Sequence, residues 1–323
     1  MKRKIILQSL FFLYAAAVFS QEASVESPNH KISIGIYNHH NTNSGQWYLT
    51  VNYIHDGKSC VAIPQIDIGL LRSDQDFSTA LKFLNAGKPN LINDQYNALH
   101  GKRSHCSNSA NEIVVSFENP SKAVLNLIIR AYNDGVAFRY EFPDKKGTYV
   151  VKDELTAYTI PSGTKRWMEK WNRGNEELYS FVGDENVQQT WSYPALFNSS
   201  DTSCWFLIHE ADVNRSYCGT KLSNQTDKSR YKLSFPDPGD GEGDSEPTIT
   251  LPWRSPWRVI ILGSLADIVG STLVNDVSAP SVLTNTDWIK PGIASWNYWS
   301  HNHGTKDYIN NWGFVTIQYQ RIC

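Results

Sequence analysis

Short stretches in which apolar and polar residues alternate dominate this chain, and they constrain its fold more than any other feature. A period of two places every second side chain on the same face of an extended strand, so these stretches predict β-strands. They are residues 31–37, 46–54, 112–117, 123–130, 136–142, 150–160, 203–209, 229–235, 248–251 and 257–262. About a dozen strands without helical crossovers between them predict an all-β fold, a large antiparallel β-super-sandwich.

One turn and one helix are also legible. Asn133, Asp134 and Gly135 stand between two predicted strands, and an Asp-Gly pair is typical of tight hairpin turns. After the strands, Ser264 can cap a helix that runs to about Asp276. Its predicted apolar face comprises Leu265, Ile268, Val269, Thr272 and Leu273.

The first twenty residues have the pattern of a secretory signal peptide. A basic head, residues 2–4, precedes an apolar stretch, residues 5–19, and Ser20 then leads into polar Gln21. The alternative, a membrane anchor, requires about 20 uninterrupted apolar residues and a stop-transfer flank. We therefore expect a periplasmic or secreted protein that starts near Gln21 and has no membrane association after cleavage.

Composition and motifs exclude several functional classes. The net charge is −2 and the isoelectric point about 6.5, so the chain lacks the basic field that nucleic-acid binding requires. No nucleophile elbow, Walker loop, His-Glu-x-x-His or Rossmann fingerprint occurs. Five cysteines without Cys-x-x-Cys spacing argue against zinc. Cys204 and Cys218 are the closest pair, but spacing alone does not decide whether they form a disulfide.

Glu210 is the acid that most clearly indicates a site. It comes directly after the apolar run at residues 205–208, so its carboxylate is expected at the end of a buried strand, where an unpaired charge is costly. It therefore requires a cation, an ion pair or backbone hydrogen-bond donors. From the residues alone, the ion pair or the donors are favoured over the cation.

A second candidate region lies upstream. Trp167 and Trp171 precede Glu176 and Glu177, and aromatic rings can stack on the apolar faces of pyranose rings. Trp167, Trp171 and Glu176 are therefore candidate substrate-binding residues, and Trp191 is a further possible aromatic platform. An exposed loop explains the two acids equally well, and the 11 Trp, 16 Tyr and 13 Phe suit a sandwich core as well as a sugar-binding surface.

Two further clusters raise the question of metal binding. Residues 236–247 form an acidic stretch rich in Gly and Pro, but EF-hand spacing is absent, so a solvated loop is favoured over a calcium site. His301 and His303 could share one face of a strand. Because Gly304 follows them, a plain loop is favoured here too.

Five groups of residues together point to a known family. They are residues 132–143, 208–212 with 217–218, 252–261, 265–269 and 287–292. In this order they resemble the N-terminal region of glycoside hydrolase family 97, which comprises α-glucosidases and α-galactosidases. The resemblance implies a β-super-sandwich packed on a (β/α)8 barrel, with the active site at their junction and a bound Ca2+ that assists catalysis. It also implies that Glu210, in the His-Glu-Ala motif, is a calcium ligand, and that the catalytic carboxylates belong to the barrel.

After the signal peptide at residues 1–20, the resemblance divides the chain into a β-sandwich domain at residues 21–285 and the start of the barrel at residues 286–323. A complete barrel needs about 250 residues, so the 36 residues from Trp288 to Cys323 are expected to hold only its first strand. After Tyr308 the sequence departs from the family pattern, as a frameshift or an early stop would produce.

The expected function is that of the N-terminal carbohydrate-binding domain of a glycoside hydrolase acting on α-linked oligosaccharides. The parent enzyme would cleave terminal α-glucosidic or α-galactosidic bonds. This chain would contribute a calcium ligand, carry no catalytic residue of its own and be inactive alone. The alternatives are a non-catalytic glycan-binding module and a non-functional gene fragment.

Overall fold

A computed structural model describes residues 21–39, 45–144, 146–183, 187–201, 204–240 and 243–292. The predicted signal peptide, His301 and His303 lie outside the described residues. The described chain forms two compact units, of which the first extends to Asp94 and resumes from Ser107 to Ser278. The second comprises Gln95–Cys106 and, of the described residues, those from Ala279 to Gly292. The predicted boundary between residues 285 and 286 stays a prediction.

The first sheet is antiparallel and has eight strands in the order β1-β2-β3-β4-β13-β20-β19-β16. They are β1 (Gln21–Glu26), β2 (Ile32–Asn38), β3 (Trp47–His55), β4 (Lys58–Asp67), β13 (Ala157–Thr159), β20 (Arg230–Ser234), β19 (Lys221–Ser223) and β16 (Thr190–Trp191). In β3, Leu49, Val51 and Tyr53 are buried whereas Thr50 and Asn52 between them are half-buried. The alternation in the sequence is therefore the alternation between the two faces of the sheet.

The second sheet has eleven strands, nine of them in the order β15-β14-β17-β18-β23-β11-β10-β9-β7, while β22 pairs with β11 and β8 with β9. They are β15 (Ser180–Gly183), β14 (Lys165–Met168), β17 (Ala195–Asn198), β18 (Trp205–Ala211), β23 (Trp257–Gly263), β11 (Gly135–Phe142), β10 (Val124–Tyr132), β9 (His105–Glu118), β7 (Lys82–Ala86), β22 (Trp253–Arg254) and β8 (Asn90–Asn97). The third sheet, in the order β21-β12-β5-β6, comprises β21 (Thr248–Thr250), β12 (Thr148–Glu154), β5 (Leu70–Arg72) and β6 (Gln75–Phe77). These sheets confirm the predicted all-β architecture.

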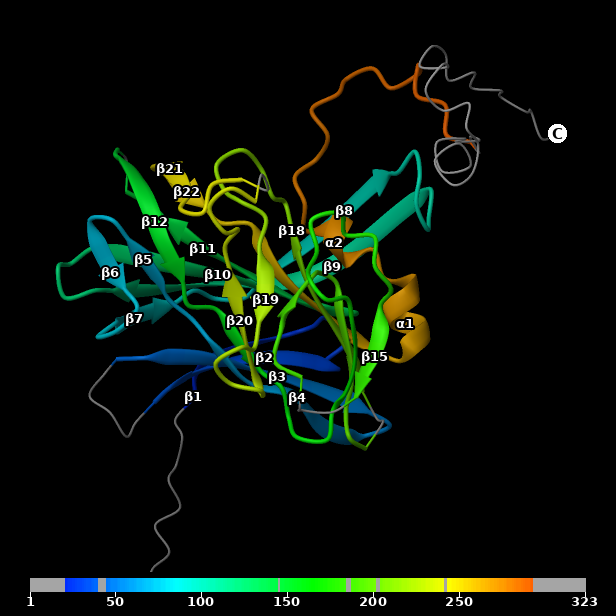
Figure 1. Cartoon of the computed structure of the whole chain (residues 1–323), viewed down its shortest axis with the longest axis horizontal. Helices are drawn as coiled ribbons and strands as arrows, with labels where there is room; N and C mark the ends of the chain where they lie inside the picture. Colours follow the sequence, from blue (N-terminus) through cyan, green and yellow to red (C-terminus); the bar gives the residue numbers. More distant parts are fainter. Residues whose placement is uncertain are drawn as a thin grey trace, which may run out of the picture. The chain divides into compact units, whose positions relative to one another are not determined.

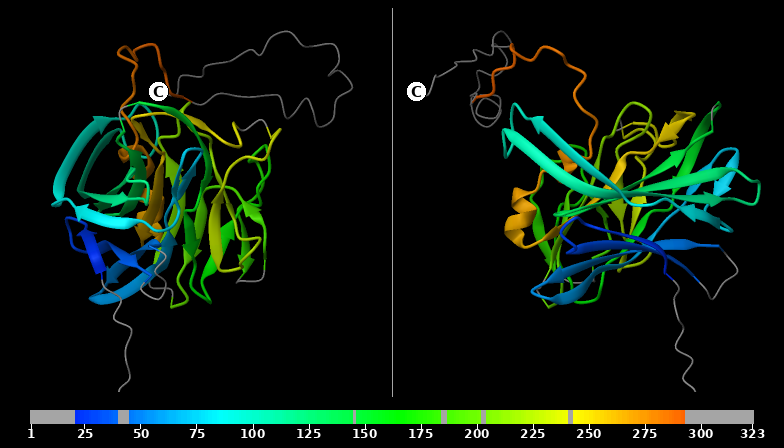
Figure 2. Two further views of the ribbon diagram at one scale, coloured as in Figure 1. Left: turned by 90° about the vertical axis from the view of Figure 1, so that its left-hand side faces the viewer. Right: turned by 180° about the vertical axis from the view of Figure 1, so that it is seen from behind.

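The main hydrophobic core of the first unit lies between the first two sheets. Figures 1 and 2 show β1–β4 as one layer and β9–β11 as the layer facing it. Ile34 and Leu49 of the first sheet and Phe138, Phe206 and Ile260 of the second all belong to this core. A second core on the opposite face of the eleven-stranded sheet contains Val259 and Ile261 of β23. Because both faces of β23 are covered, all seven of its residues are buried.

Two short helices stand where one was predicted. α1 (Leu265–Gly270) begins at Ser264, whose side chain and that of Asp267 form a reciprocal capping box, as the sequence predicts. The helix ends at Ser271, which has extended backbone angles, and α2 (Leu273–Asp276) follows. The predicted apolar face is only partly buried, since Leu265 is 44% and Val269 65% exposed. Among the described residues, no helix has the length and apolar character needed to cross a membrane.

The described cysteines Cys60, Cys106, Cys204 and Cys218 are all free thiols. Cys204 immediately precedes β18, whereas Cys218 lies seven residues beyond its last residue, Ala211. The pair that is closest in sequence is therefore separated by a whole extended strand and its following loop.

The predicted hairpin at Asn133-Asp134-Gly135 is present, with Tyr132 opposite Gly135. A Cβ atom on Gly135 would lie 2.3 Å from the carbonyl oxygen of Ile260 and 2.5 Å from a methyl group of Leu273. The turn therefore requires glycine because β23 and α2 pack directly against its backbone.

We expect Gly135→Ala to lower the free energy of unfolding by about 3 kcal/mol, because two packed elements must move apart. Urea unfolding followed by circular dichroism measures the change. Gly292→Ala is the control, since no atom lies within 4 Å of its Cβ position. A loss for Gly135→Ala no larger than that of the control would contradict this account of the turn.

Because four tyrosines are buried, we expect the folded chain to lose stability at alkaline pH. Burial raises the pKa of Tyr140, Tyr158, Tyr193 and Tyr217 above the ordinary value of 10.0. The unfolded chain loses these phenol protons near pH 10 while the folded chain keeps them, so their contribution to stability is complete below pH 10 and is lost as the pH rises. Tyrosinate absorbance of these residues should appear only together with loss of the near-ultraviolet circular dichroism. Complete tyrosine ionisation in a chain that keeps this signal would contradict the prediction.

Candidate functional site

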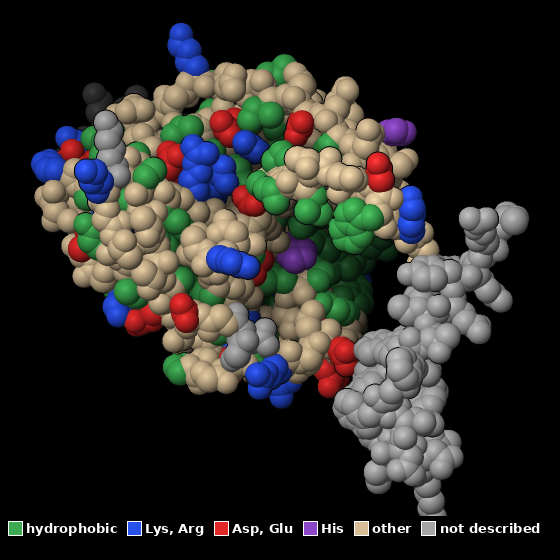
Figure 3. Space-filling model, turned by 90° about the horizontal axis from the view of Figure 1, so that it is seen from above, with side chains coloured by type: hydrophobic (Ala, Val, Ile, Leu, Met, Phe, Trp, Pro, Cys, Tyr) green, Lys and Arg blue, Asp and Glu red, His purple; other side chains and the backbone are tan. Residues whose placement is uncertain are grey.

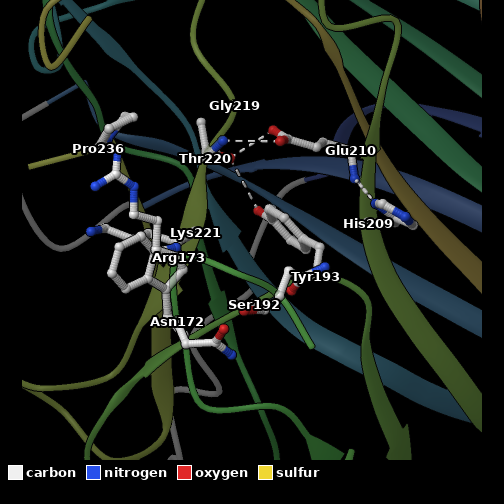
Figure 4. A pocket seen from close by; sticks show the side chains of 12 residues that line it. Asn172, Arg173, Ser192, Tyr193, His209, Glu210, Gly219, Thr220, Lys221 and Pro236 are labelled. Atoms are coloured by element: carbon white, nitrogen blue, oxygen red, sulfur yellow. Dashed lines mark hydrogen bonds between the residues drawn. The ribbon is translucent and has the colours of Figure 1, made fainter. Parts of the chain in front are cut away.

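A pocket of about 300 Å³ lies in the first unit beside the end of β18 and the start of β19. Its lining residues are Trp171, Asn172, Arg173, Asn175, Ser192, Tyr193, His209, Glu210, Gly219, Thr220, Lys221 and Pro236. Figure 4 shows Glu210 and Thr220 facing one another on one side of this pocket, with Arg173 and Pro236 on the other. Two of the predicted site residues, Glu210 and Trp171, therefore line the same pocket.

Glu210 is held by three hydrogen bonds. Its Oε1 accepts the backbone N–H of Thr220 at 2.9 Å, and its Oε2 accepts the Thr220 hydroxyl at 2.7 Å. Oε2 also accepts Nη1 of Arg258 at 2.9 Å. The ion pair and backbone donor that the sequence favoured are thus present. A carboxylate oxygen has two lone pairs, so Oε1 retains one that no described hydrogen bond uses.

Arg258 connects Glu210 to a second acid, Glu154. Its Nε and Nη2 donate to Oε1 and Oε2 of Glu154 at 2.8 and 2.6 Å. The side chains of Arg258 and Glu154 are fully buried, whereas that of Glu210 is 10% exposed. Burial raises the pKa of Glu210, and the attraction of Arg258 together with the Thr220 donors acts in the opposite direction. Glu210 is therefore the member of this trio that meets the pocket.

His209 and Tyr193 form the adjoining wall. Their rings stack with centroids 5.7 Å apart, and the Tyr193 hydroxyl lies 3.5 Å from Oγ1 of Thr220. Nδ1 of His209 accepts the backbone N–H of Glu210 at 2.8 Å, so the ring proton resides on Nε2. Burial lowers the pKa of His209, which keeps the imidazole neutral at pH 7.

Trp171 lines the pocket, and the ammonium group of Lys221 lies over one face of its ring. Nζ of Lys221 lies 4.0 Å from the centroid of the Trp171 ring and is paired with Asp237 at 2.8 Å and Asp240 at 3.3 Å. Two acids of the 236–247 loop are thus used to neutralise a buried lysine, as in a structural loop. The described residues contain no group of three or more His, Cys, Asp or Glu side chains that could hold a metal ion.

The other candidate residues lie outside the pocket lining. Trp167 packs between Phe181 and Trp205, with ring centroids 5.2 and 5.1 Å away. Glu176 is exposed on the loop after Trp171. Trp191 is 2% exposed and donates its Nε1–H to Asn224 at 3.0 Å. The interpretation of Trp191 as an aromatic platform for sugars is therefore wrong, because its ring is part of the core.

The comparisons with known proteins agree with this architecture. The sequence profile described as "Glycosyl-hydrolase 97 N-terminal" matches residues 25–280. The chain belongs to glycoside hydrolase family 97. The family resemblance is thereby confirmed, and four of the five sequence segments lie within the matched residues.

Individual similar proteins match most of this chain but are longer. A "Probable retaining alpha-galactosidase" of Streptomyces bingchenggensis is 27% identical over 232 residues, which are 72% of this chain and 35% of the relative. A crystal structure of a β-arabinopyranosidase superimposes with a TM-score of 0.73 at 27% identity, covering 83% of this chain and 44% of the other. An acarbose complex of a family 97 enzyme from Pseudoalteromonas shares the fold, with a TM-score of 0.71 at 23% identity, covering 84% and 40%. The chain spans about a third of the length of the curated relatives it matches.

Sequence reasoning missed Arg258, Glu154 and Thr220, which hold Glu210 in place. One signal was available. Arg258 stands at the start of an otherwise apolar strand, and a charge within a buried strand requires a charged partner. The identity of that partner could not be read, since Glu154 is 104 residues away in sequence.

The loop that carries Asn172, Arg173 and Asn175 is anchored by one buried acid. Oε1 of Glu169, whose residue is fully buried, accepts Nδ2 of Asn172 and the backbone N–H of Glu177, both at 2.8 Å. Two ends of the loop are therefore fixed to the same atom, which gives the pocket a defined wall.

We expect Glu169→Ala to speed tryptic cleavage after Arg173 about tenfold, because each lost buried hydrogen bond costs about 1–3 kcal/mol and makes local opening more frequent. Gel analysis of timed digests measures the rate. Glu177→Ala is the matched control, since it keeps the backbone N–H that Glu169 binds. Equal cleavage rates in the two variants would show that Glu169 does not anchor the loop.

Proposed function

We propose that this chain forms the N-terminal sandwich of a calcium-dependent α-glycosidase and supplies Glu210 to the active site, with α-galactosides as the favoured substrates. The observation that carries the proposal is the position of Glu210. In a domain of family 97, the carboxylate of the His-Glu-Ala motif lies at a pocket, 10% exposed, and keeps one lone pair free of described hydrogen bonds. The printed name of the Streptomyces relative, a retaining α-galactosidase, supports the choice of substrate.

Among the described pocket residues, Glu210 can serve as one ligand of Ca2+. Calcium prefers about 6–8 hard oxygen ligands, and Glu210 can offer one oxygen toward the pocket. The remaining oxygens must come from elsewhere, which suits a site shared with a catalytic domain. When bound, Ca2+ supplies positive charge beside the reacting sugar. Thr220 and Arg258 hold the carboxylate of Glu210 in place, and the neutral His209 and Tyr193 shield it from bulk water.

The pocket also contains groups suited to a sugar. Ser192, Asn172 and Asn175 all line this space. Hydroxyl and amide groups of this kind bind sugar hydroxyls, and Trp171 lines the same space. Figure 3 shows acidic and basic side chains interspersed over the face seen from above, and hydrophobic side chains gathered around a hollow. The polar and aromatic lining of the pocket supports an α-linked oligosaccharide as the ligand and, as a second candidate function, glycan binding without catalysis.

The experiment is a domain exchange. We expect the purified chain to show no turnover of an aryl α-galactoside, because the paired carboxylates of such enzymes are expected on the barrel. Residues 25–280 should support turnover when they replace the matching region of the Streptomyces relative. In that chimera, Glu210→Gln should raise the calcium concentration for half-maximal rate about 10–100-fold.

Glu118→Gln is the control, since it removes one acid that pairs with Lys122 at 2.6 Å. A chimera whose calcium requirement is unchanged by Glu210→Gln would refute the proposed role of Glu210. Turnover by the isolated chain above a no-enzyme control would refute its expected inactivity.

A further inference from the structure

The buried carboxylate of Glu154 accepts hydrogen bonds from two hydroxyl groups in addition to its ion pair with Arg258. Beyond the two bonds from Arg258, its Oε1 accepts the hydroxyl of Thr156 and its Oε2 the hydroxyl of Tyr217, both at 2.8 Å. The hydroxyls of Tyr140 and Thr156 lie 2.8 Å apart, and Gly69 N–H donates to Tyr140 at 3.1 Å. All four lone-pair positions of the buried carboxylate are thus used, so its position is fixed.

The fixed carboxylate in turn fixes the guanidinium of Arg258. Nε and Nη2 bind Glu154 in a two-pronged pair, which leaves the planar group one orientation. In that orientation Nη1 meets Oε2 of Glu210 at 2.9 Å. The bond occupies the oxygen of Glu210 that also accepts the Thr220 hydroxyl, and leaves Oε1 with its unused lone pair.

We propose that Glu154 and Arg258 are positioning residues for a divalent cation at Glu210, in which Arg258 orients the carboxylate and Glu154 cancels the positive charge of Arg258. The inference rests on the proposed function of Glu210 and adds two residues that never reach the pocket. Two acids and one arginine carry a net charge of −1. A guanidinium alone beside Glu210 would repel a cation, whereas the Glu154–Arg258 pair keeps the bond that orients Glu210 without that repulsion.

Stability alone does not explain this arrangement. A buried ion pair costs several kcal/mol of desolvation per ion, and well-packed apolar residues of similar volume are often equally stable or better. The chain surrounds this trio with Tyr140, Tyr158 and Tyr217 and with a continuous apolar core. Every charged group of this buried trio has its hydrogen-bond partners, and only Glu210 reaches the pocket. We therefore attribute the arrangement to the need to hold the carboxylate of Glu210 in one orientation.

Terbium luminescence tests the proposal on the whole chain. Tb3+ occupies oxygen sites of the kind that Ca2+ prefers, and nearby tyrosine and tryptophan side chains sensitise its emission. Tyr193 and Trp171 line the pocket with Glu210. Because Glu210 supplies one oxygen in this chain and water supplies the others, we expect a weak component of the Tb3+ titration that Ca2+ competes for and that Glu210→Gln removes. The signal left in Glu210→Gln measures Tb3+ on other acidic side chains.

Glu154→Gln should weaken the Glu210 component about tenfold, since it uncovers a positive charge within about 10 Å of the cation. Tyr217→Phe removes a hydrogen bond from Glu154 but no charge, so its affinity should stay within about twofold even where the fold is destabilised. Glu118→Gln, which alters the net charge equally, should have no effect. Near-ultraviolet circular dichroism verifies that each variant is folded.

Arg258→Lys is the second variant, because it keeps the charge but cannot bind both acids with one planar group. It should also weaken the Glu210 component about tenfold. If Glu210→Gln removes the component but either Glu154→Gln or Arg258→Lys leaves its affinity unchanged, the positioning roles are overturned. The proposed cation site at Glu210 would then still stand. Should Glu154→Gln not fold, Arg258→Lys decides between the two outcomes. A wild-type titration without any component that depends on Glu210 overturns both the positioning roles and the proposed cation site.

Discussion

The buried guanidinium of Arg258 is the charge on which the arrangement of this domain depends. It binds Glu154 at the end of β12, in the four-stranded sheet, and Glu210 on β18, in the eleven-stranded sheet. Thr156, which donates to Glu154, directly precedes β13 of the eight-stranded sheet. One fully buried cation therefore joins two of the three sheets directly, and its partner Glu154 reaches the third through Thr156. Removing either acid would leave that cation uncompensated in a medium of low polarity.

The strands were predictable because their signal is local. In β3 and β10 the alternation of side chains follows directly from the pleat. The Asp134-Gly135 pair predicts a tight hairpin turn, and the structure has it. Short strands such as β5, β6 and β16 have only two or three residues each, too few for a period to be visible. The single predicted helix divides in two because Ser271 leaves the helical conformation. The Ser271 hydroxyl donates to Asp134 of the hairpin, a long-range contact that the sequence does not reveal.

The candidate site was predictable only in part. Glu210 could be recognised as an acid after an apolar strand, and its need for a partner follows from the cost of burying charge. Trp171 was found through its residue type, but so were Trp167 and Trp191, which pack against other aromatic rings or in the core. Whether an aromatic side chain faces a pocket or a core depends on sheet pairing over long distances. Glu154 carried no local signal at all, since its partner is brought to it by the fold.

The way in which the loop after Trp171 is anchored determines which of its residues can change without loss of its conformation. Glu169 holds this loop through the side chain of Asn172 and the main chain of Glu177. The anchor makes no use of the side chains at positions 173–176, two of which, Arg173 and Asn175, line the pocket. Arg173 can be exchanged while the loop keeps its frame, whereas Asn175 has a φ of 49° in the left-handed region that favours Gly and Asn. A single substitution at Arg173 can thus change the lining of the pocket without rebuilding the sandwich beneath it.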